Sequence, residues 1–302
     1  YSGRSALLVG PIIDDFSKLT GVHVAVKYGS TSEIAAILLE EGDNSPADVF
    51  FSQDPGGLGA VVEMLSPLTE DLLTLVPEWA RDPNDTWVGI SGRARVIVYN
   101  TDVLTEADLP DSVEGLSSSV WQGRVGWSPG NASFQMMVTT MRVSWGEDRT
   151  NEWLRRMHAN GTKIYTKNTP LVAAVGSGEI DVGLVNHYYL HRFIREEGES
   201  FSARNYHPRG GGPDAVVMVA GAGIMRTAAN HDNAEKFLRF MLSNAAQSYF
   251  ASTTFEYPLV EGVVSSPLFE SLADVSYPEV DVADLADLRR TQALLRELGI
   301  IP

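Results

Sequence analysis

The sequence predicts an α/β protein made of two halves that share one binding cleft. Over the first 64 residues, helical and strand patterns alternate, which is typical of parallel α/β units. Three apolar strands along the chain are each followed directly by polar residues, and ligands of open α/β sheets bind beyond the carboxyl ends of strands. A length of 302 residues allows one large domain or two of roughly 150 residues.

The spacing of apolar residues assigns the first elements. Helical spacing runs from Ala6 to Phe16, with Pro11 as a bend or as the helix start. Val22–Tyr28 alternates apolar and polar residues, which predicts a strand. Ser32 is the candidate N-cap of the next helix. The elements predicted after Tyr28 are a helix at Thr31–Glu41, a strand at Ala47–Phe51 and a helix at Leu58–Met64.

The rest of the chain continues the alternation. Asp102–Leu116 is a polar connection, and Gly210–Gly212 is a flexible break. The predicted strands are Arg95–Tyr99, Arg124–Trp127, Ile164-Tyr165, Ile180–Val185 and Ala215–Val219. The predicted helices are Phe134–Val143, Glu152–Ala159, Thr169–Gly176, Leu190–Glu197, Asn233–Ser243, Ala246–Ser252 and Val282–Leu298.

Composition narrows the class of protein. The formal net charge of −16 argues against polyanionic partners such as nucleic acid. The absence of cysteine excludes disulfides, thiolate zinc sites, iron–sulfur clusters and a cysteine nucleophile. No apolar run approaches the ~18–20 residues of a membrane span. Tyr1 opens the chain without a signal-peptide pattern, so either there is no leader or one has been removed.

Negative charge gathers at the two ends of the chain, in residues 1–80 and 256–302. One interpretation is a solvated surface that keeps the protein in solution. The other is that the ends and the middle belong to different lobes.

Three polar clusters follow buried strands. They are Ser52-Gln53-Asp54, Asn131-Ala132-Ser133 and Asn186-His187-Tyr188-Tyr189. Serine and asparagine at such places also sit at helix N-termini, where free backbone N–H groups favour anions. The clusters therefore predict one ligand site, with an anion among the ligands.

The motifs in and around these clusters carry a resemblance that covers nearly the whole chain. At these positions the chain resembles the ferric-binding proteins, the iron-binding members of the bacterial periplasmic or extracellular solute-binding proteins that feed ABC transporters. The tyrosine pair in its context is the most specific element. The matching pieces are Tyr1–Arg4, Ala47–Asp54, Trp87–Tyr99, Lys167-Asn168-Thr169, Gly178–Asp181, Asn186–Tyr189 and Phe255–Leu259.

The resemblance implies a two-lobe fold of the type II periplasmic-binding-protein class, with an interlobe cleft and a two-strand hinge. The hinge strands would be about Gly92–Val98 and Val216–Gly221. The implied lobes are 1–92 plus 222–272 for the N-terminal lobe and 93–221 plus 273–302 for the C-terminal lobe.

The implied function is that of a solute-binding protein and not of an enzyme. It would capture ferric ion with a synergistic anion (carbonate, phosphate or a small carboxylate), close over them, and be recognised by an ABC-transporter permease. The implied protein is a periplasmic or extracellular monomer, with lipid anchoring at the cell surface left open.

The tyrosine pair suits the chemistry of that ion. Fe³⁺ prefers anionic oxygen ligands, and a bound trivalent cation lowers the phenol pKa far below its ordinary value near ~10. On an irregular stretch, Tyr188 and Tyr189 can both face one ion, whereas on a strand they would point to opposite faces. The alternative is a packed aromatic pair at a strand end.

The other metal ligands are less defined. Some family members add a histidine near the N-terminus and a glutamate after the second strand. Here Ser5 and Gln53 stand at those positions, and Asp54 follows Gln53. Other members use a third tyrosine, where this chain has Phe134. The remaining ligands would come from an exogenous anion, water, Gln53 or Asp54, and Asp54 could instead cap a helix.

Anion contacts are predicted from side chains that can donate hydrogen bonds. The planar guanidinium of Arg4 matches carbonate or carboxylate, and Ser5 lies beside it. Ser133, Asn168 and Asn186 can donate to the oxygens of the anion. For Ser133 and Asn168, helix capping is an equal alternative.

Three rival interpretations remain. The first is a protein of the same fold that binds a small organic or phosphorus-containing anion without metal. The second is a zinc site at His187 and His191, with an exposed surface face as its alternative. The third is a hydrolase using Asp54 and His187, for which no nucleophile–base set is visible. Gly210–Gly212 lacks the Gly-Lys-Ser/Thr of a phosphate loop.

Overall fold

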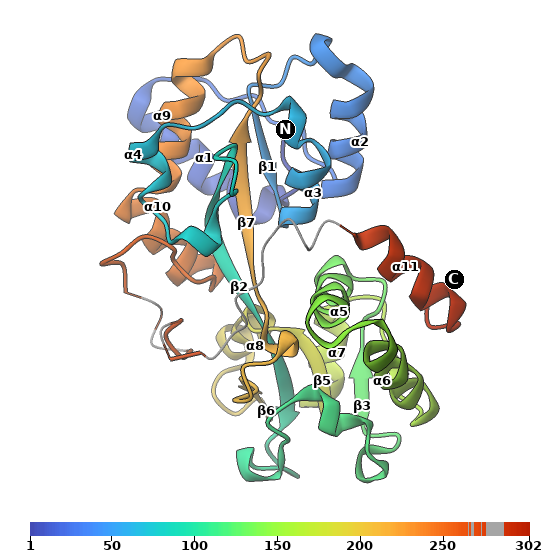
Figure 1. Cartoon of the computed structure of the whole chain (residues 1–302). Coiled ribbons are helices and arrows are strands. Elements are labelled where there is room, and N and C mark those ends of the chain that lie inside the picture. Colours follow the sequence, from blue (N-terminus) through green and yellow to red (C-terminus); the bar gives the residue numbers. More distant parts are fainter. Residues whose placement is uncertain (265, 267–268, 273, 276–286) are drawn as a thin grey trace. The chain divides into compact units, whose positions relative to one another are not determined.

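The computed structural model describes residues 1–264, 266, 269–272, 274–275 and 287–302. The chain forms two compact units (Figure 1). Unit 1 consists mainly of Tyr1–Gly92 and Met218–Ser271, and unit 2 mainly of Arg93–Val217 and Asp287–Pro302. The predicted lobe limits stay a prediction, and residues 273 and 276–286 of the predicted C-terminal lobe lie outside the described part of the chain.

Two long strands connect the units. β2 (Trp87–Asn100) passes from unit 1 to unit 2 between Gly92 and Arg93, and β7 (Val217–Ile224) passes back between Val217 and Met218. Both predicted hinge segments fall on or next to these strands. Every residue of β2 is buried, as expected for a strand with neighbours on both sides.

Unit 1 contains a short antiparallel pair, β1–β7, with helices α1 and α9 to one side and α2 to the other (Figure 1). Phe16 of α1 packs edge-on against Phe237 of α9, with ring centroids 5.2 Å apart. The bounds are α1 Ala6–Thr20, α2 Thr31–Glu41, β1 Val49–Ser52, α3 Pro55–Ala60, α4 Glu70–Leu73, α9 His231–Met241 and α10 Asn244–Tyr249, continued by a π-helical turn at Phe250–Thr254.

The predicted strand at Val22–Tyr28 is wrong. In this segment only Tyr28 forms a β-bridge, to Ser2, and Ser2 also bridges Phe51 of β1. Half-buried and exposed side chains still alternate along it, with Val22, Val24 and Val26 half-buried. The segment has the side-chain pattern of a strand, but it lacks a neighbouring strand along most of its length.

Two details of the predicted helices differ as well. α1 begins at Ala6 and continues through Pro11, so the helix does not start at Pro11. The N-cap of α2 is Ser30, not Ser32. Ser30 Oγ accepts a hydrogen bond from the Glu33 N–H (3.3 Å), and the Glu33 carboxylate accepts one from the Ser30 N–H (2.8 Å). This reciprocal capping box satisfies two free backbone donors.

Unit 2 has a mixed sheet. β3, β4 and β5 pair in parallel around β3, whereas β2 pairs antiparallel with β5 and β6. The bounds are β3 Val125–Trp127, α5 Ala132–Trp145, α6 Glu147–Ala159, β4 Lys163–Ile164, α7 Asn168–Gly176, β5 Val182–Asn186, α8 Tyr188–Glu197, β6 Ala203–Tyr206 and α11 Leu288–Glu297.

The sheet differs from the prediction in two ways. Among the named strands, the expected parallel pairing holds for β3, β4 and β5. β2 pairs antiparallel with β5, and β7 pairs antiparallel with β1. β6 was not predicted from the sequence. The predicted helix at Val282–Leu298 is described from Asp287 onward, and residues 282–286 lie outside the described part.

The direction of β3 and β5 sets the position of two polar clusters. Since these strands are parallel neighbours, their carboxyl ends meet at one edge of the sheet. The cluster at Asn131–Ser133 follows β3, and the cluster at Asn186–Tyr189 follows β5. Below that edge the core of unit 2 contains Trp127 and Trp153, both fully buried.

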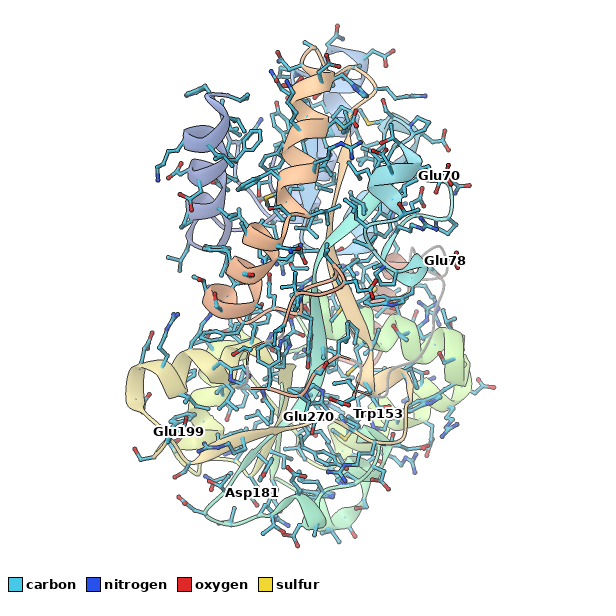
Figure 2. The ribbon with its side chains drawn as sticks, turned by 90° about the vertical axis from the view of Figure 1, so that its left-hand side faces the viewer. Glu70, Glu78, Trp153, Asp181, Glu199 and Glu270 are labelled. Carbon is cyan, nitrogen blue, oxygen red and sulfur yellow. The ribbon has the colours of Figure 1, made fainter. Side chains whose placement is uncertain are left out.

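Acidic side chains lie mostly at the periphery of each unit. Figure 2 shows Glu70, Glu78 and Glu199 pointing outward, and all three are exposed, whereas Trp153 lies inside unit 2. This placement agrees with the interpretation of the acidic surplus as solvated surface. None of the helices in the described residues is long and apolar enough to cross a bilayer.

Candidate functional site

The tyrosine pair lies at the N-terminus of α8. β5 ends at Asn186, His187 is the N-cap, and Tyr188 and Tyr189 occupy the first helical turn. The expectation that the pair lies on an irregular stretch is therefore wrong, because both tyrosines are helical. In this turn the Cα–Cβ bonds tilt toward the helix N-terminus, so both side chains lean back toward the end of β5.

The two rings form one stacked unit. Their centroids are 4.3 Å apart and their planes make an angle of 27°. Tyr188 is buried and Tyr189 is half-buried. The guanidinium of Arg192 lies 5.3 Å from the Tyr188 ring centroid and 5.6 Å from that of Tyr189. A cation over two aromatic faces holds the rings in place, and the helix N-terminus favours negative charge on them.

A buried hydrogen-bonded chain lies next to the pair. The Asn186 Nδ2 donates to Ser133 Oγ at 3.0 Å, and Arg95 Nη1 donates to Asn186 Oδ1 at 3.1 Å. Asn186 and Arg95 are directly opposite each other in the β2–β5 register. Ser133 lies in the first turn of α5, whose N-cap is Asn131. The parallel ends of β3 and β5 thus bring together two residues that the sequence predicted as anion contacts.

Arg95 is a candidate site residue that sequence reasoning missed. It is 1% exposed, and its Nε and Nη2 atoms have no hydrogen-bond partner within the described residues. Burial lowers the pKa of Arg95 to about 9, while the nearby Tyr189 and Tyr188 oppose the shift. No Asp or Glu of the described chain forms an ion pair with it. A buried cation without a counter-charge is costly, so the position is suited to an anion.

A signal for Arg95 was present in the sequence. Charged residues are rarely found inside a fully buried strand, and Arg95 interrupts the apolar run Ala94–Tyr99. The matching hydrogen-bonding partner, Asn186, could not be identified because the β2–β5 pairing was not predicted.

Asn168 begins α7 and is 1% exposed. It is not the helix cap, since Lys167 is the N-cap residue. Its Nδ2 and Oδ1 atoms have no hydrogen-bond partner in the part of the chain that the structure describes. Asn168 therefore does not join the Asn186–Ser133 chain, although its amide is free to bind a ligand. Ser133 is not a cap either, because Asn131 accepts from the Ser133 N–H.

In unit 1, Arg4 is engaged by a carboxylate. Arg4 Nη2 donates to both oxygens of Glu256, at 2.6 and 2.8 Å, and both side chains are fully buried. Its charge is balanced inside unit 1, in contrast to that of Arg95. Ser5 is exposed and is the N-cap residue of α1, without a side-chain capping bond.

Gln53 and Asp54 follow β1 as the sequence predicted. Asp54 is the N-cap of α3, and its Oδ1 accepts from the Gly57 N–H at 3.1 Å. The capping alternative considered for Asp54 therefore holds. Gln53 is half-buried, and its backbone N–H donates to Thr31 Oγ1 at 3.0 Å.

The histidines near the tyrosines are buried, so the exposed face expected for them is wrong. His187 Nδ1 accepts from the Ala94 N–H at 3.2 Å, which fixes the N-cap residue of α8 to β2. Burial lowers the pKa of His191 to about 4. The described residues contain no group of three or more His, Cys, Asp or Glu side chains placed to hold a metal ion.

Phe134, at the third-tyrosine position, packs edge-on against Trp127 in the core.

The fold, with the tyrosine pair beside the buried Arg95–Asn186–Ser133 chain, is that of a solute-binding protein. Residues 42–280 match the family described as bacterial extracellular solute-binding protein, and the chain belongs to that family. Its fold is that of the periplasmic binding proteins.

Within this class the chain is similar to iron-binding members. It is 32% identical to the major ferric iron-binding protein of Neisseria meningitidis, over 99% of this chain and 92% of that protein. It is also 32% identical to the Fe(3+)-binding periplasmic protein of Serratia marcescens, over 100% of this chain and 90% of that protein. Iron-bound HitA from Pseudomonas aeruginosa superposes with a TM-score of 0.92 at 32% identity, covering 99% of this chain and 98% of that one.

Proposed function

We propose that the protein binds ferric ion through the phenolate oxygens of Tyr188 and Tyr189, together with a small anion held by Asn186, Ser133 and Arg95. The observation that carries this proposal is the stacked tyrosine pair beside a buried arginine that forms no ion pair with any carboxylate among the described residues. The names of the relatives, which are ferric iron-binding proteins, support iron as the cargo. A solved relative from Trichodesmium with iron and citrate supports the joint binding of an anion.

The formal charges of the proposed site indicate how much negative charge the anion should carry. Two phenolates balance two of the three charges of Fe³⁺, and the guanidinium of Arg95 adds one more. An anion with two negative charges would leave this set neutral, which is the condition for burying it at low cost. Carbonate and hydrogen phosphate meet this condition, and a small carboxylate such as citrate can also meet it.

Other predicted contacts stay part of the proposal. Asn168 has a free buried amide suited to an anion oxygen. Gln53 and Asp54 remain candidate ligands of the metal, and Arg4 and Ser5 remain candidate anion contacts. Arg4 is the weaker of the two arginines for this role, because Glu256 already accepts two hydrogen bonds from it.

The wider role follows from the family. We infer that the protein is a binding protein and not an enzyme, and that it delivers its cargo to an ABC-transporter permease as a periplasmic or extracellular monomer. The two units would be the two predicted lobes, 1–92 plus 222–272 and 93–221 plus 273–302. The supporting observations are the family membership and the names of the relatives.

A thermal unfolding experiment distinguishes a protein that binds iron together with an anion from one that binds an anion without metal. Thermal unfolding is measured with Fe³⁺ plus carbonate, with Fe³⁺ plus citrate, and with carbonate, phosphate or citrate alone. We expect a large rise in Tm only when iron is present, because a ligand bound far above its Kd stabilises by mass action. If carbonate, phosphate or citrate alone gives the full rise and iron adds nothing, the metal-free alternative is correct.

Variants test the anion contacts separately. Ser133→Ala and Arg95→Met should weaken the iron-dependent rise, and adding more carbonate should recover part of it for Ser133→Ala. Ser177→Ala is the matched control, since Ser177 Oγ donates to the Ala174 carbonyl at the end of α7, away from the tyrosine pair. If Arg95→Met binds iron and carbonate like the unaltered protein, Arg95 is not an anion contact.

A further inference from the structure

His187 joins the end of β5 to the start of α8, and the proposed iron site gives its side chain no role. It stands between Asn186, the last residue of the strand, and Tyr188, the first residue of the helix. Its side chain is fully buried, and its backbone angles are already helical, with φ −54° and ψ −39°. The chain therefore passes from strand to helix without a loop, and the tyrosine pair takes its position directly from His187.

The backbone of His187 continues the pairing of β5 with β2 in one direction only. Arg95 lies opposite Asn186, so the next pair in this antiparallel register is Ala94 with His187. The His187 N–H donates to the Ala94 carbonyl at 3.0 Å, as a strand residue would. In a regular antiparallel pair that exchanges hydrogen bonds, the Ala94 N–H would donate to the His187 carbonyl in return.

The imidazole of His187 takes the place of that carbonyl. The Ala94 N–H donates to His187 Nδ1 at 3.2 Å. The His187 carbonyl instead accepts a hydrogen bond from Asn205 Nδ2 of β6 at 2.8 Å. Because Ala94 is fully buried, its N–H needs an acceptor inside the protein. The side chain of His187 thus completes the pairing with β2 while its backbone turns into α8.

We propose that His187 is a positioning residue for iron, whose imidazole ends β5 at Asn186 and so lets Tyr188 and Tyr189 share one helical turn. This inference rests on the proposed iron site. If the His187 carbonyl returned to Ala94, β5 would extend toward the tyrosines, and successive side chains of a strand point to opposite faces. The two rings would then lose their stacking at 4.3 Å and could not bind one ion together.

The ring of His187 also contacts the nearer tyrosine. Its centroid lies 5.9 Å from that of Tyr188, and the two planes make an angle of 89°, an edge-to-face contact. The test must therefore separate the acceptor atom from the ring. Asparagine and glutamine both lack the ring. The Oδ1 of asparagine lies near the place of Nδ1, whereas the Oε1 of glutamine lies nearer that of Nε2.

Three substitutions test the acceptor atom. His187→Leu removes it, His187→Gln moves it away from Ala94, and His187→Asn restores it. Each variant is loaded with Fe³⁺ and carbonate, and the tyrosinate-to-iron band and the rate of iron removal by a chelator are recorded. We expect removal to be roughly tenfold faster in His187→Leu and His187→Gln, the effect of about one lost hydrogen bond. His187→Asn should restore most of the band and of the slow removal.

A measurement without iron separates this inference from the proposed function. Near-ultraviolet circular dichroism of the iron-free protein reports on the stacked rings, and the double variant Tyr188→Phe with Tyr189→Phe defines their share of the signal. That share should fall in His187→Gln and return in His187→Asn. Asn205→Ala is a second variant for the case that His187→Leu does not fold. Asn205 is half-buried, and its loss frees the His187 carbonyl to return to Ala94.

The outcomes are distinct. An unchanged tyrosine signal and an unchanged rate of iron removal in His187→Gln and Asn205→Ala would overturn the inference. So would a His187→Asn protein that behaves like His187→Gln, or variants that lose only Tm and keep the band and the removal rate. If the unaltered protein shows no band with iron, the proposed function fails, and the iron-free comparison still decides whether His187 positions the tyrosines.

Discussion

The buried ion pair of unit 1 gives the most specific prediction for a single substitution. Glu256 accepts two hydrogen bonds from Arg4, one from Ser91 Oγ at 2.9 Å and one from Thr254 Oγ1 at 3.3 Å. All four side chains are fully or almost fully buried. Glu256→Gln keeps the shape of this side chain and removes its charge, which leaves the Arg4 cation without a counter-charge.

The expected loss can be estimated from the structure. Removing one partner of a buried ion pair costs about 3–5 kcal/mol, because an uncompensated charge remains. The glutamine carbonyl still accepts one hydrogen bond from Arg4, so the loss should lie near the lower end, at about 3 kcal/mol. For units of this size, such a loss corresponds to a fall in Tm of roughly 6–12 °C.

The assay is urea unfolding of the iron-free protein, followed by circular dichroism. Glu40→Gln is the matched control, since Glu40 is exposed and its substitution should change the free energy of unfolding by less than about 0.5 kcal/mol. The double variant Arg4→Met with Glu256→Leu should be more stable than Glu256→Gln, because both charges are then absent. A Glu256→Gln protein as stable as the Glu40→Gln control would refute the reasoning.

Two further predictions concern unit 2. Arg142 donates to the Asp287 carbonyl (3.0 Å), Thr291 Oγ1 (2.9 Å) and Glu147 (2.7 Å), and so joins α5 to α11. Arg142→Met should lower the free energy of unfolding by about 2 kcal/mol and speed hydrogen exchange in Leu288–Glu297; unchanged exchange there would contradict this role. Burial lowers the pKa of His207 to about 4, from 6.5 when unfolded. Between these values the unfolded chain binds a proton that the folded chain excludes, so stability should fall as the pH falls from 6.5 to 4. His207→Asn should reduce this slope in urea unfolding at pH 7, 5.5 and 4.5, and an unchanged slope would show that His207 does not contribute.

Local sequence patterns predicted the parts of the site that depend on neighbouring residues. The polar cluster after β5 could be placed at a strand end, because an apolar run stops at Val185 and helical spacing resumes at Leu190. The proximity of Asn186 and Ser133 follows from the parallel direction of β3 and β5, which alternating helices and strands indicate. The capping role of Asp54 is also local, since its acceptor lies three residues before the donor.

Features that depend on distant segments could not be predicted. Arg4 was predicted to contact an anion from the shape of its guanidinium group. Its ion pair with Glu256 could not be foreseen, because Glu256 is 252 residues away in the sequence. The charge of Arg95 becomes significant only when β2 pairs with β5 and buries it. Val22–Tyr28 has a correct strand pattern, but pattern alone does not supply the neighbour that makes a strand. In each case the missing information is which segments pair in three dimensions.

The central claim is that two phenolates bind the iron, and the visible spectrum tests it most directly. Fe³⁺ with carbonate should give the unaltered protein a tyrosinate-to-iron charge-transfer band. The band should remain in Tyr28→Phe, whose ring is half-exposed in unit 1, and should disappear in Tyr188→Phe with Tyr189→Phe. A protein that stays colourless with iron, or a double variant that keeps the full band, would contradict the account.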